Sequence, residues 1–421
     1  MIVQRTETHI IKESNPIYGW ILEECSRSKN LYNKTLFIYR QAFTGNHDKI
    51  EDFKPIIRHE KFISSFELVK QMAKLKDEDY YAITKKNSGT QVVCQVDRVM
   101  KSWFAALKSY KKDPSKFRGR PRIPSYKKKN ELNCLIYTYV DAKLQKDGTI
   151  NLRRDIKLPI HTNLKNFQQI RLVPEAGYVQ VEIIYNKEIN GTNLDKTRAI
   201  GIDLGLNNLM AITSNIGNIS NLVNGRPLKS INQYYNKRKA HLTSLVEKGK
   251  LKSSKRLRHL EMKRTCKIKD YLHKTSRRVV ELMEQNNIGT CFIGHNKGWK
   301  QEISIGSKNN QNFVSIPYSL LINMLKYKLE EKGGQLIELN EAYTSKCSFL
   351  DNEEICKHEF YKGKRIKRGL FLSSDKKALN ADINGSLNIL KQGIGFTFKV
   401  ENEIFRPTKI DIQKKLLNLL G

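Results

Sequence analysis

Residues 199–208 read Ala-Ile-Gly-Ile-Asp-Leu-Gly-Leu-Asn-Asn, an apolar strand that carries one carboxylate, Asp203, just before a glycine-containing turn. Side chains alternate between the two faces of a strand, so Asp203 points to the opposite face from its apolar neighbours Ile202 and Leu204. A carboxylate in that place is suited to bind a cation. The alternative is an aspartate that only caps the turn. The stretch therefore predicts a buried strand with a candidate metal ligand near its end.

A second stretch, residues 379–390, reads Leu-Asn-Ala-Asp-Ile-Asn-Gly-Ser-Leu-Asn-Ile-Leu. Asp382 begins a helix with an apolar face that includes Ile383 and Leu387, and an acid at this position is often only a helix cap. Together with Asp203, it can instead complete a metal site. Two fold families carry an aspartate on such a strand: RNase H-like nucleases use it as a metal ligand, and actin-like ATPases use it to hold phosphate and metal. The sequence contains neither an adenosine-binding glycine run nor a second phosphate loop, so the nuclease fold is favoured.

The rest of the chain shows three successive patterns. Residues 16–99 have apolar residues at helical spacing, and a second helix is expected near 91–110. Residues 131–189 alternate with period two, which predicts antiparallel strands of a small barrel or sheet. The pattern after Arg198 predicts an α/β layer domain. Its expected elements are a strand from 198, long basic helices between 231 and 286, a strand over 290–293, a helix over 317–332 and a strand over 335–339. Residues 393–421 show no regular pattern.

The composition narrows the kinds of partner. The 76 Lys and Arg against 42 Asp and Glu give a formal charge of +34 over 421 residues. A polyanionic partner is the simplest explanation for such an excess. No stretch approaches the ~18 consecutive apolar residues of a membrane helix, and the first residues lack the apolar run of a secretory signal, so we expect no membrane contact. The seven cysteines are odd in number and scattered, which favours reduced thiols and an intracellular protein.

Two segments are candidates for contact with nucleic acid. Residues 111–129 form a basic loop interrupted by prolines, and Phe117 and Tyr126 between the charges suit phosphate contact plus base stacking. The alternative is a solvated linker. A polar, aromatic loop that includes residues 298–301 either contacts nucleic acid or covers the active site. The residues expected to contact nucleic acid are Lys116, Arg118, Arg120, Arg122, Lys127, Lys128, Trp299 and Lys300.

Three motifs together resemble one family. Residues 201–205 read Gly-Ile-Asp-Leu-Gly, residues 343–347 read Tyr-Thr-Ser-Lys-Cys, and residues 381–389 read Ala-Asp-Ile-Asn-Gly-Ser-Leu-Asn-Ile. The combination resembles TnpB, the insertion-sequence protein related to type V CRISPR effector nucleases, over essentially the whole C-terminal half. The resemblance implies a multidomain α+β fold with a RuvC/RNase H-like nuclease domain, a β-barrel wedge-like domain and a helical recognition lobe.

The resemblance also implies boundaries and partners. We expect the wedge-like barrel over 1–15 and 131–197, the recognition lobe over 16–130, the nuclease domain over 198–392 with a hairpin insertion over 346–378, and a C-terminal tail over 393–421. The implied partners are a guide RNA from the element's end and a double-stranded DNA target with a short motif beside it. The expected location is the cytoplasm of a prokaryotic cell, at the nucleoid, and no signal in the sequence sets the oligomeric state.

In that family the active site has three acids, and the chain departs from this pattern at the second. Asp203 and Asp382 match the first and third acids, whereas Gly294 stands where the second, a glutamate, is expected. Glu341 follows the neighbouring strand, and catalytic groups gather at the carboxyl ends of parallel strands, so we expect Glu341 to replace the missing acid. Weaker substitutes are Glu338, Glu353 and Glu354. The alternative is that Glu341 only solvates a loop and the enzyme is inactive.

Three converging acids repel one another unless cations neutralise them, so Asp203, Glu341 and Asp382 imply Mg²⁺, and two ions ~4 Å apart are expected. Zinc is not expected. Family members often carry two Cys-x-x-Cys pairs before the final aspartate, whereas this chain offers only Cys347, Cys356 and His358, fewer than a closed tetrahedral site needs. We expect a metal-free hairpin over 360–372.

The expected function is RNA-guided, Mg²⁺-dependent hydrolysis of DNA phosphodiesters next to a short motif, by a protein encoded on a transposable element. Base pairing with the guide would supply specificity, while Lys and Arg side chains follow the backbones. The alternative from a different class is a nuclease-inactive, RNA-guided DNA-binding protein that acts as a repressor or a transposition accessory. An actin-like ATPase would leave the positive charge unexplained.

Overall fold

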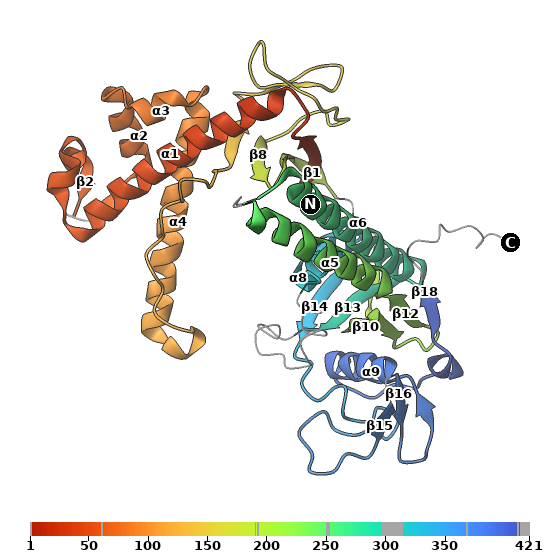
Figure 1. The fold of residues 1–421 in the computed structure, drawn as a ribbon. Coiled ribbons are helices and arrows are strands. Elements are labelled where there is room, and N and C mark those ends of the chain that lie inside the picture. Colours follow the sequence, from red (N-terminus) through yellow and green to blue (C-terminus); the bar gives the residue numbers. More distant parts are fainter. Residues whose placement is uncertain are drawn as a thin grey trace. The chain divides into compact units, whose positions relative to one another are not determined.

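The computed structural model describes residues 2–59, 62–189, 191, 193–249, 253–295, 315–367, 369–410 and 412 (Figure 1). By its internal contacts the chain divides into two compact units, Ile2–Glu188 and Ile189–Gly421, each described by itself below. Helices and sheets occur in both, which confirms the predicted multidomain α+β fold. The finer division into three domains and a tail stays a prediction. Within the described residues, no helix has the length and apolarity to cross a membrane.

The N-terminal unit is built on two long helices, α1 (Ile17–Thr44) and α4 (Lys86–Lys112), which pack against each other. Each buries one stripe of residues at helical spacing, such as Cys25, Leu36 and Val93, and exposes basic residues elsewhere. The shorter elements of this part are η1 (His47–Ile56), β2 (Ile57–Arg58), β3 (Phe62–Ile63), α2 (Ser65–Lys74), α3 (Glu78–Ala82) and η2 (Pro114–Lys116).

The strands of the N-terminal unit form an antiparallel sheet in the order β1-β9-β8-β4. These are β1 (Ile2–Lys12), β9 (Tyr178–Glu188), β8 (Gln169–Glu175) and β4 (Leu135–Thr138). A separate small sheet contains β5 (Lys143–Leu144), β6 (Ile150–Asn151) and β7 (Lys157–Leu158). Strand β1 pairs with β9 along its whole length, from Ile2 opposite Glu188 to Lys12 opposite Tyr178. Of the two predicted alternatives, a small barrel or a sheet, the described strands form an open sheet.

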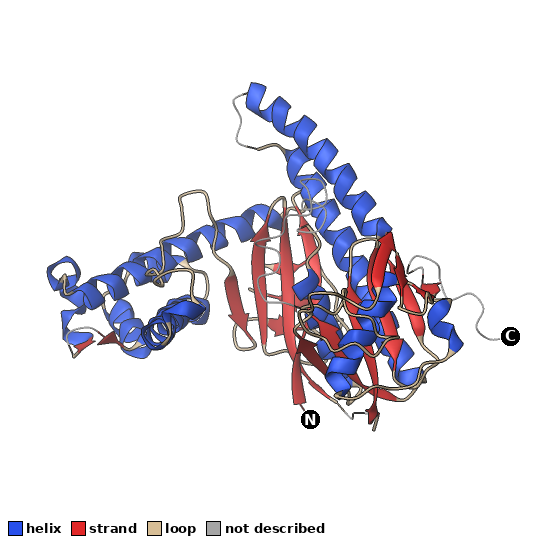
Figure 2. Ribbon diagram, turned by 90° about the horizontal axis from the view of Figure 1, so that it is seen from below, coloured by secondary structure: helices blue, strands red, loops and turns tan. Residues whose placement is uncertain are grey.

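The C-terminal unit contains a six-stranded sheet in the order β14-β13-β10-β11-β12-β18. Three strands form an antiparallel meander: β10 (Asp195–Leu204), β11 (Asn208–Ser214) and β12 (Ser220–Asn224). Two later strands, β13 (Ile288–Gly294) and β14 (Gln335–Leu339), run parallel to β10 on its other side. Figure 2 shows these strands in red and the helices in blue. This arrangement is the RNase H-like α/β sheet that the sequence predicts.

Helices cover both faces of this sheet. The C-terminal unit contributes α5 (Arg226–Lys248), α6 (Lys255–Gln285), α8 (Tyr318–Glu331) and α9 (Ala381–Ile394). Helices α6 and α8 contact each other and share a core with Ile200 and Ile202 of β10, whereas α9 packs against β10, β11 and β13. Because side chains alternate along a strand, Asp203 lies on the face of β10 that α9 covers.

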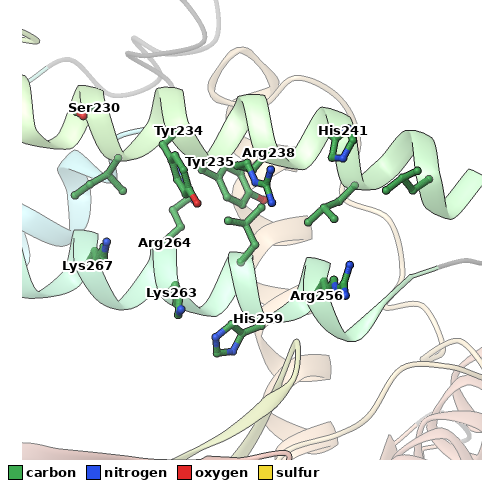
Figure 3. A pocket seen from close by; sticks show the side chains of 14 residues that line it. Ser230, Tyr234, Tyr235, Arg238, His241, Arg256, His259, Lys263, Arg264 and Lys267 are labelled. Carbon is green, nitrogen blue, oxygen red and sulfur yellow. The ribbon is translucent and has the colours of Figure 1, made fainter.

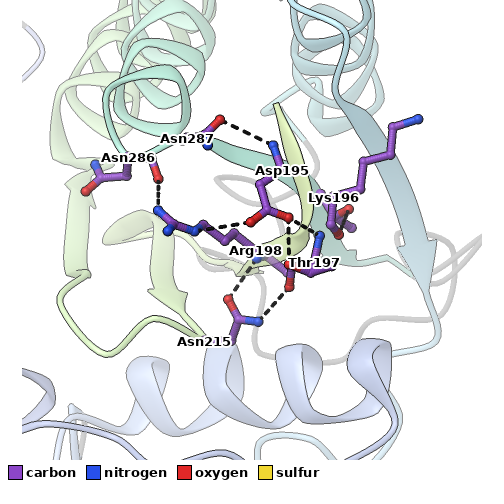
Figure 4. Close-up of polar contacts among 9 residues, drawn as sticks. Asp195, Lys196, Thr197, Arg198, Asn215, Asn286 and Asn287 are labelled. Atoms are coloured by element: carbon purple, nitrogen blue, oxygen red, sulfur yellow. Dashed lines mark hydrogen bonds and ion pairs between the residues drawn. The ribbon is translucent and has the colours of Figure 1, made fainter. Parts of the chain in front are cut away.

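The start of β10 is held by a network of polar side chains (Figure 4). The carboxylate of Asp195 accepts hydrogen bonds from the backbone N–H and the hydroxyl of Thr197, at 2.8 and 2.6 Å, and lies 3.3 Å from the guanidinium of Arg198. Asn215 donates to the Thr197 carbonyl and accepts from the N–H of Ala199. Through Asn215, these contacts tie the start of β10 to the residue that follows β11.

Residues 393–421 are not wholly irregular, so that prediction was wrong. A short helix, η3 (Asn402–Phe405), precedes β18 (Thr408–Ile410), which adds to the sheet parallel to β12 with Lys409 opposite Leu222. Three residues are too few to show a period-two pattern in the sequence. The strand forms because the edge of β12 offers unpaired backbone groups.

The predicted insertion contains a three-stranded sheet in the order β15-β16-β17. Its strands are β15 (Lys364–Lys367), β16 (Leu370–Leu372) and β17 (Ala378–Leu379). The first two form an antiparallel hairpin, with Lys364 opposite Leu372. The hairpin expected over 360–372 is therefore present.

Candidate active site

Asp203 is the penultimate residue of β10 and pairs with Ala211 of β11. Its side chain is half-buried against α9. A Cβ atom built on Gly385 of α9 would lie 2.7 Å from Oδ2 of Asp203, so a side chain at that position would displace the carboxylate. Ser386 strengthens the same contact, because its hydroxyl donates to the Gly201 carbonyl at 2.8 Å. The close approach of α9 to β10 therefore depends on small residues of the 381–389 motif.

Asp382 lies in the first turn of α9, one helical turn before Gly385 and on the same face. Asn380 caps the helix, because its Oδ1 accepts from the N–H groups of Asp382 and Ile383. The Asp382 carboxylate is therefore not needed as a cap. Asn208 Nδ2 donates to Asp382 Oδ2 at 2.7 Å, and a guanidinium nitrogen of Arg365 lies 3.7 Å from Oδ1. The helix start thus presents Asp382 toward the face on which Asp203 lies.

Glu341 comes from the segment that follows β14, and it lies beside the position of the missing acid. A Cβ atom built on Gly294 would be 3.1 Å from the Cβ of Glu341 and 2.6 Å from Cδ1 of Ile389. A side chain at position 294 would therefore compete with Glu341 for space. The register explains the approach, since Gly294 pairs with Leu339, two residues before Glu341. The Cβ of Glu341 therefore lies next to the position that the Cβ of the absent side chain would take.

Helix α9 also holds the backbone around Glu341. Asn384 and Asn388 are fully buried one turn apart, and both donate to the carbonyl of Cys347 at 2.8 Å. Asn388 also donates to the Thr344 carbonyl, and Thr344 donates through its hydroxyl to the carbonyl of Glu341 at 2.8 Å. Sequence reasoning missed Asn208, Asn384 and Asn388. The available signal was amides spaced four residues apart on an otherwise apolar helix.

The electrostatics show that Asp203 is affected by the other two carboxylates. The pKa of Asp203 is raised well above its ordinary value, first by burial and then by the charges of Asp382 and Glu341, while Arg365 offsets part of the effect. Burial raises the pKa of Glu341, and His295 partly opposes that shift. The structure thus brings together the three acids named from the sequence, whose catalytic role stays a prediction.

This donor set fits Mg²⁺ completed by water and phosphate. Within the described residues, no three His, Cys, Asp or Glu side chains form a ready ligand group around one point. Mg²⁺ does not require such a cage, because it keeps several waters and usually binds one or two carboxylates plus substrate phosphates. The charge at Asp203, which Arg365 offsets only in part, is the chemical reason for an ion here. Asp203, Glu341 and Asp382 are the residues that would hold it.

The insertion does not fit a tetrahedral zinc site. Cys347 Sγ donates to the Cys356 carbonyl at 3.6 Å, and His358 Nε2 lies 3.4 Å from Cys356 Sγ and 2.8 Å from the carbonyl of Glu354. Three donors engaged in other contacts do not supply the four ligands of a closed site. The expectation of no zinc stays a prediction.

Two carboxylates link the strands of this insertion. Glu353 is buried and accepts from the backbone N–H groups of Ser348 and Lys362, at 2.7 and 2.9 Å. Asp351 accepts from the backbone N–H of Ser374 at 3.0 Å and from its hydroxyl. Glu353 is thus occupied in structure and Glu338 contacts His295 at 2.8 Å, which leaves both weaker candidates for the second acid than Glu341.

The predicted basic loop follows the helices of the N-terminal unit. Its cationic side chains are mostly exposed, but its aromatic rings are already engaged. Phe117 packs edge-on against Tyr110, and the guanidinium of Arg40 lies 4.8 Å from the centre of the Tyr126 ring. The loop therefore offers charge more than stacking surface. Lys116, Arg118, Arg120, Arg122 and Lys128 are exposed, and Lys127 is half-buried; Trp299 and Lys300 lie outside the described residues.

A second basic surface, not singled out from the sequence, lies between α5 and α6 (Figure 3). A groove of about 650 Å³ separates the two helices and has no acidic residue in its lining. Tyr234 is 64% exposed at this groove, and Arg264 lies over the ring of Tyr235. The cationic residues of the lining are Arg238, Arg256, Lys263, Arg264 and Lys267.

Comparison with known proteins supports the C-terminal motifs. A family model described as a probable transposase (OrfB_IS605) matches residues 182–300, and a model described as a Cas12f1-like TNB domain matches residues 318–389. A curated relative, the TnpB-like protein ORF457 of Acidianus two-tailed virus, is 26% identical over 220 residues, which is 50% of this chain. The match spans 44% of the relative's own length.

The fold also has a solved counterpart. The cryo-EM structure of the Cas12f1–sgRNA–target DNA complex contains a chain that is 16% identical, with a TM-score of 0.50 over 87% of this chain and 82% of that one. At this identity the likeness concerns the fold alone. Two matching family models and a TnpB-like relative thus support the resemblance of the C-terminal unit to the TnpB family, and the solved structure shares its fold.

Proposed function

We propose that this protein is an RNA-guided, Mg²⁺-dependent DNA endonuclease encoded by a transposable element. The observation that carries the proposal is that Asp382 and Glu341 lie near enough to Asp203, on the α9 side of an RNase H-like sheet, for their charges to raise its pKa. Asp203 comes from β10, Glu341 from the end of β14 and Asp382 from the start of α9, and the pKa of Asp203 responds to both others. Arg365 neutralises these acids only in part, and neighbouring carboxylates that repel one another are suited to bind divalent ions.

The chemistry follows from these groups. Two divalent ions, when bound, would activate a water molecule and stabilise the oxygen that leaves the phosphodiester. Because its pKa is raised, the Asp203 carboxyl keeps a proton to higher pH than an ordinary aspartate, and ion binding must release that proton. Ion affinity should therefore rise with pH. Asn208 orients the Asp382 carboxylate, and the α9 amides hold the backbone beside Glu341.

The partners are inferred from charge and from the fold relative. The solved relative is a complex with sgRNA and target DNA, and we extend those two partner classes to this chain. The net charge of +34 suits contact with phosphate backbones. The exposed cations of residues 116–128 and the groove between α5 and α6 are the surfaces that would contact the phosphate backbones.

A second function is favoured by one observation, the glycine at position 294. If Glu341 does not act as the second acid, the protein would bind RNA and DNA without cutting, as a repressor or transposition accessory. Every basic surface would keep its role, and only the acid cluster would be without function.

The test is cleavage of supercoiled plasmid libraries by protein co-expressed with RNA from its own locus, with Mg²⁺ or EDTA. We expect cleavage that requires Mg²⁺ and that falls roughly 10³-fold or more in Asp203→Ala, because the cluster loses its central ligand. Asp375→Ala, which removes an exposed carboxylate of the insertion, should cut like the wild type. Guide-dependent DNA binding without any cleavage by the wild type would favour the second function.

A further inference from the structure

A small pocket lies beside the acid cluster, formed where the C-terminal strand joins the sheet. Its volume is about 190 Å³, and its lining comes from β11, β12, β18 and the first residue of α5. The lining residues are Asn208, Leu222, Asn224, Arg226, Lys409 and Ile410. We call it the β18 pocket. It contains two cations and two amides and no acidic residue.

Asn208 connects the β18 pocket to the acid cluster. Its Nδ2 donates to Asp382 Oδ2 at 2.7 Å, and the same residue lines the pocket. Asn208 begins β11 and Asn224 ends β12. Both therefore lie at the same end of the strands as Asp203, which is near the end of β10. Only the side chain of Asn208 would thus separate an anion in the pocket from the Asp382 carboxylate, which is proposed to hold metal.

The cations of the pocket have no acid to neutralise them. Arg226 and Lys409 are both exposed, and neither makes an ion pair with a carboxylate in the described part of the chain. Their backbone positions are nevertheless well defined. Asn224 Oδ1 accepts from the N–H of Arg226 at 3.1 Å, the hydroxyl of Tyr271 donates to the Asn224 carbonyl, and Lys409 is held opposite Leu222 by strand pairing.

We propose that the β18 pocket binds a phosphodiester group of the strand being cut, next to the phosphate that lies at the acid cluster. Lys409 and Arg226 would contact the phosphate oxygens, which are the anions that cationic side chains recognise along a nucleic-acid backbone. The proposal rests on the proposed function for its substrate. It gives the C-terminal strand a role, because β18 brings Lys409 to the site. Binding one phosphate there holds the next in place for reaction.

The test combines protein and substrate changes. Single-turnover cleavage is measured with DNA targets in which each phosphate within three nucleotides of the cut is replaced, one at a time, by a neutral methylphosphonate. For wild-type protein we expect the methylphosphonate at a single position, other than the phosphate that is cut, to slow cleavage about tenfold, as loss of a charge-assisted contact would. In Lys409→Ala, cleavage of the unmodified target should slow by a similar factor, and the same methylphosphonate should add less than about twofold.

Control variants separate this role from a structural one. Lys399→Ala removes an exposed lysine of the same C-terminal segment and should leave cleavage unchanged. Lys409→Arg keeps the charge and should retain most of the rate. Arg226→Ala should show the same loss of sensitivity to the methylphosphonate as Lys409→Ala.

A binding measurement provides a readout that does not need cleavage. In an Asp203→Ala background, the guide-loaded protein should bind the methylphosphonate target about threefold more weakly than the unmodified one, and this difference should vanish in Asp203→Ala/Lys409→Ala. If every methylphosphonate affects Lys409→Ala as it affects the wild type, the pocket holds no phosphate and the inference is wrong. If the wild type binds the target but never cuts it, cleavage fails as the function while the binding comparison still decides the pocket.

Discussion

Two groups of carboxylates lie close to α9 in the C-terminal unit, and they differ in the number of hydrogen-bond donors that they meet. In the insertion, Glu353 meets two backbone N–H groups. Burial alone would raise the pKa of Asp351, but hydrogen bonds from Ser348 and Ser374 lower it overall. At the acid cluster the pKa of Asp203 is instead raised by burial and by Asp382 and Glu341.

The difference separates structure from function. A carboxylate whose lone pairs are satisfied by donors stabilises the fold as it stands. Carboxylates that face one another without sufficient donors destabilise the metal-free fold and are suited to bind cations. Carboxylates therefore link chain segments in the insertion, whereas in the acid cluster they are suited to bind the ions of the proposed reaction. The predictions below either remove that contrast or make it quantitative.

Among the variants that test this contrast, the largest effect is expected at Glu341. We expect Glu341→Ala to lower the cleavage rate roughly 100-fold or more, because the cluster loses one of its three acids. Gly294→Glu combined with Glu341→Ala returns an acid to the usual position, where the end of the Ile389 side chain must shift to admit a Cβ at residue 294. This double variant should recover part of the lost rate in the plasmid assay. Wild-type activity in Glu341→Ala would show that Glu341 has no role in the cluster.

A smaller effect is expected at Asn208. Removing its amide in Asn208→Ala leaves Asp382 without the donor at 2.7 Å, so the carboxylate can turn away from the site. We expect cleavage to slow about tenfold, with a higher Mg²⁺ concentration at half-maximal rate. Asn163→Ala, which removes an exposed asparagine of the N-terminal unit, is the control. An unchanged Mg²⁺ dependence would mean that Asn208 does not position Asp382.

In the insertion the expected effect is on stability. Glu353→Gln replaces one acceptor of a buried pair of hydrogen bonds by a donor, at a cost of about 1.5–3 kcal/mol. The Tm should fall by roughly 5 °C. The exposed neighbour Glu354 supplies the control, Glu354→Gln, which should melt like the wild type. In buffer without added Mg²⁺, EDTA should not change the Tm of either protein; a fall in wild-type Tm on chelation there would instead indicate a structural metal.

The smallest effect is a pH-dependent gain in stability when Asp203 is replaced by asparagine. Since its folded-state pKa is raised, the stability that this group contributes is present below the ordinary carboxyl pKa and is lost as pH rises through the raised value. Without Mg²⁺, Asp203→Asn should therefore melt close to the wild type near pH 5 and a few degrees higher near pH 8. Mg²⁺ should raise the Tm of the wild type and not of the variant. A wild type that is the more stable protein at pH 8 without metal would contradict the picture of repelling acids.

Much of the C-terminal unit could be predicted from local patterns. The strand over 335–339 matches β14, and the helix over 317–332 matches α8 within one residue at each end. Asp203 and Asp382 were recognisable because a lone carboxylate in apolar surroundings is poorly explained by packing. In contrast, β18 was missed, because a three-residue strand owes its existence to the edge of β12 and not to its own sequence.

The sequence by itself determined the nature of the protein: its excess of positive charge, the alternating and helical patterns that make a mixed fold, and two aspartates in motifs that resemble one family. The sequence also predicts Glu341 as the third acid, but only the tertiary structure shows how it comes to lie beside position 294. Glu341 and Gly294 are far apart in sequence, and their Cβ positions meet because β13 and β14 pair in one register. The same is true of Lys409 beside Asn208. Contacts of this kind depend on the packing of strands and helices over long sequence distances, which local patterns do not encode.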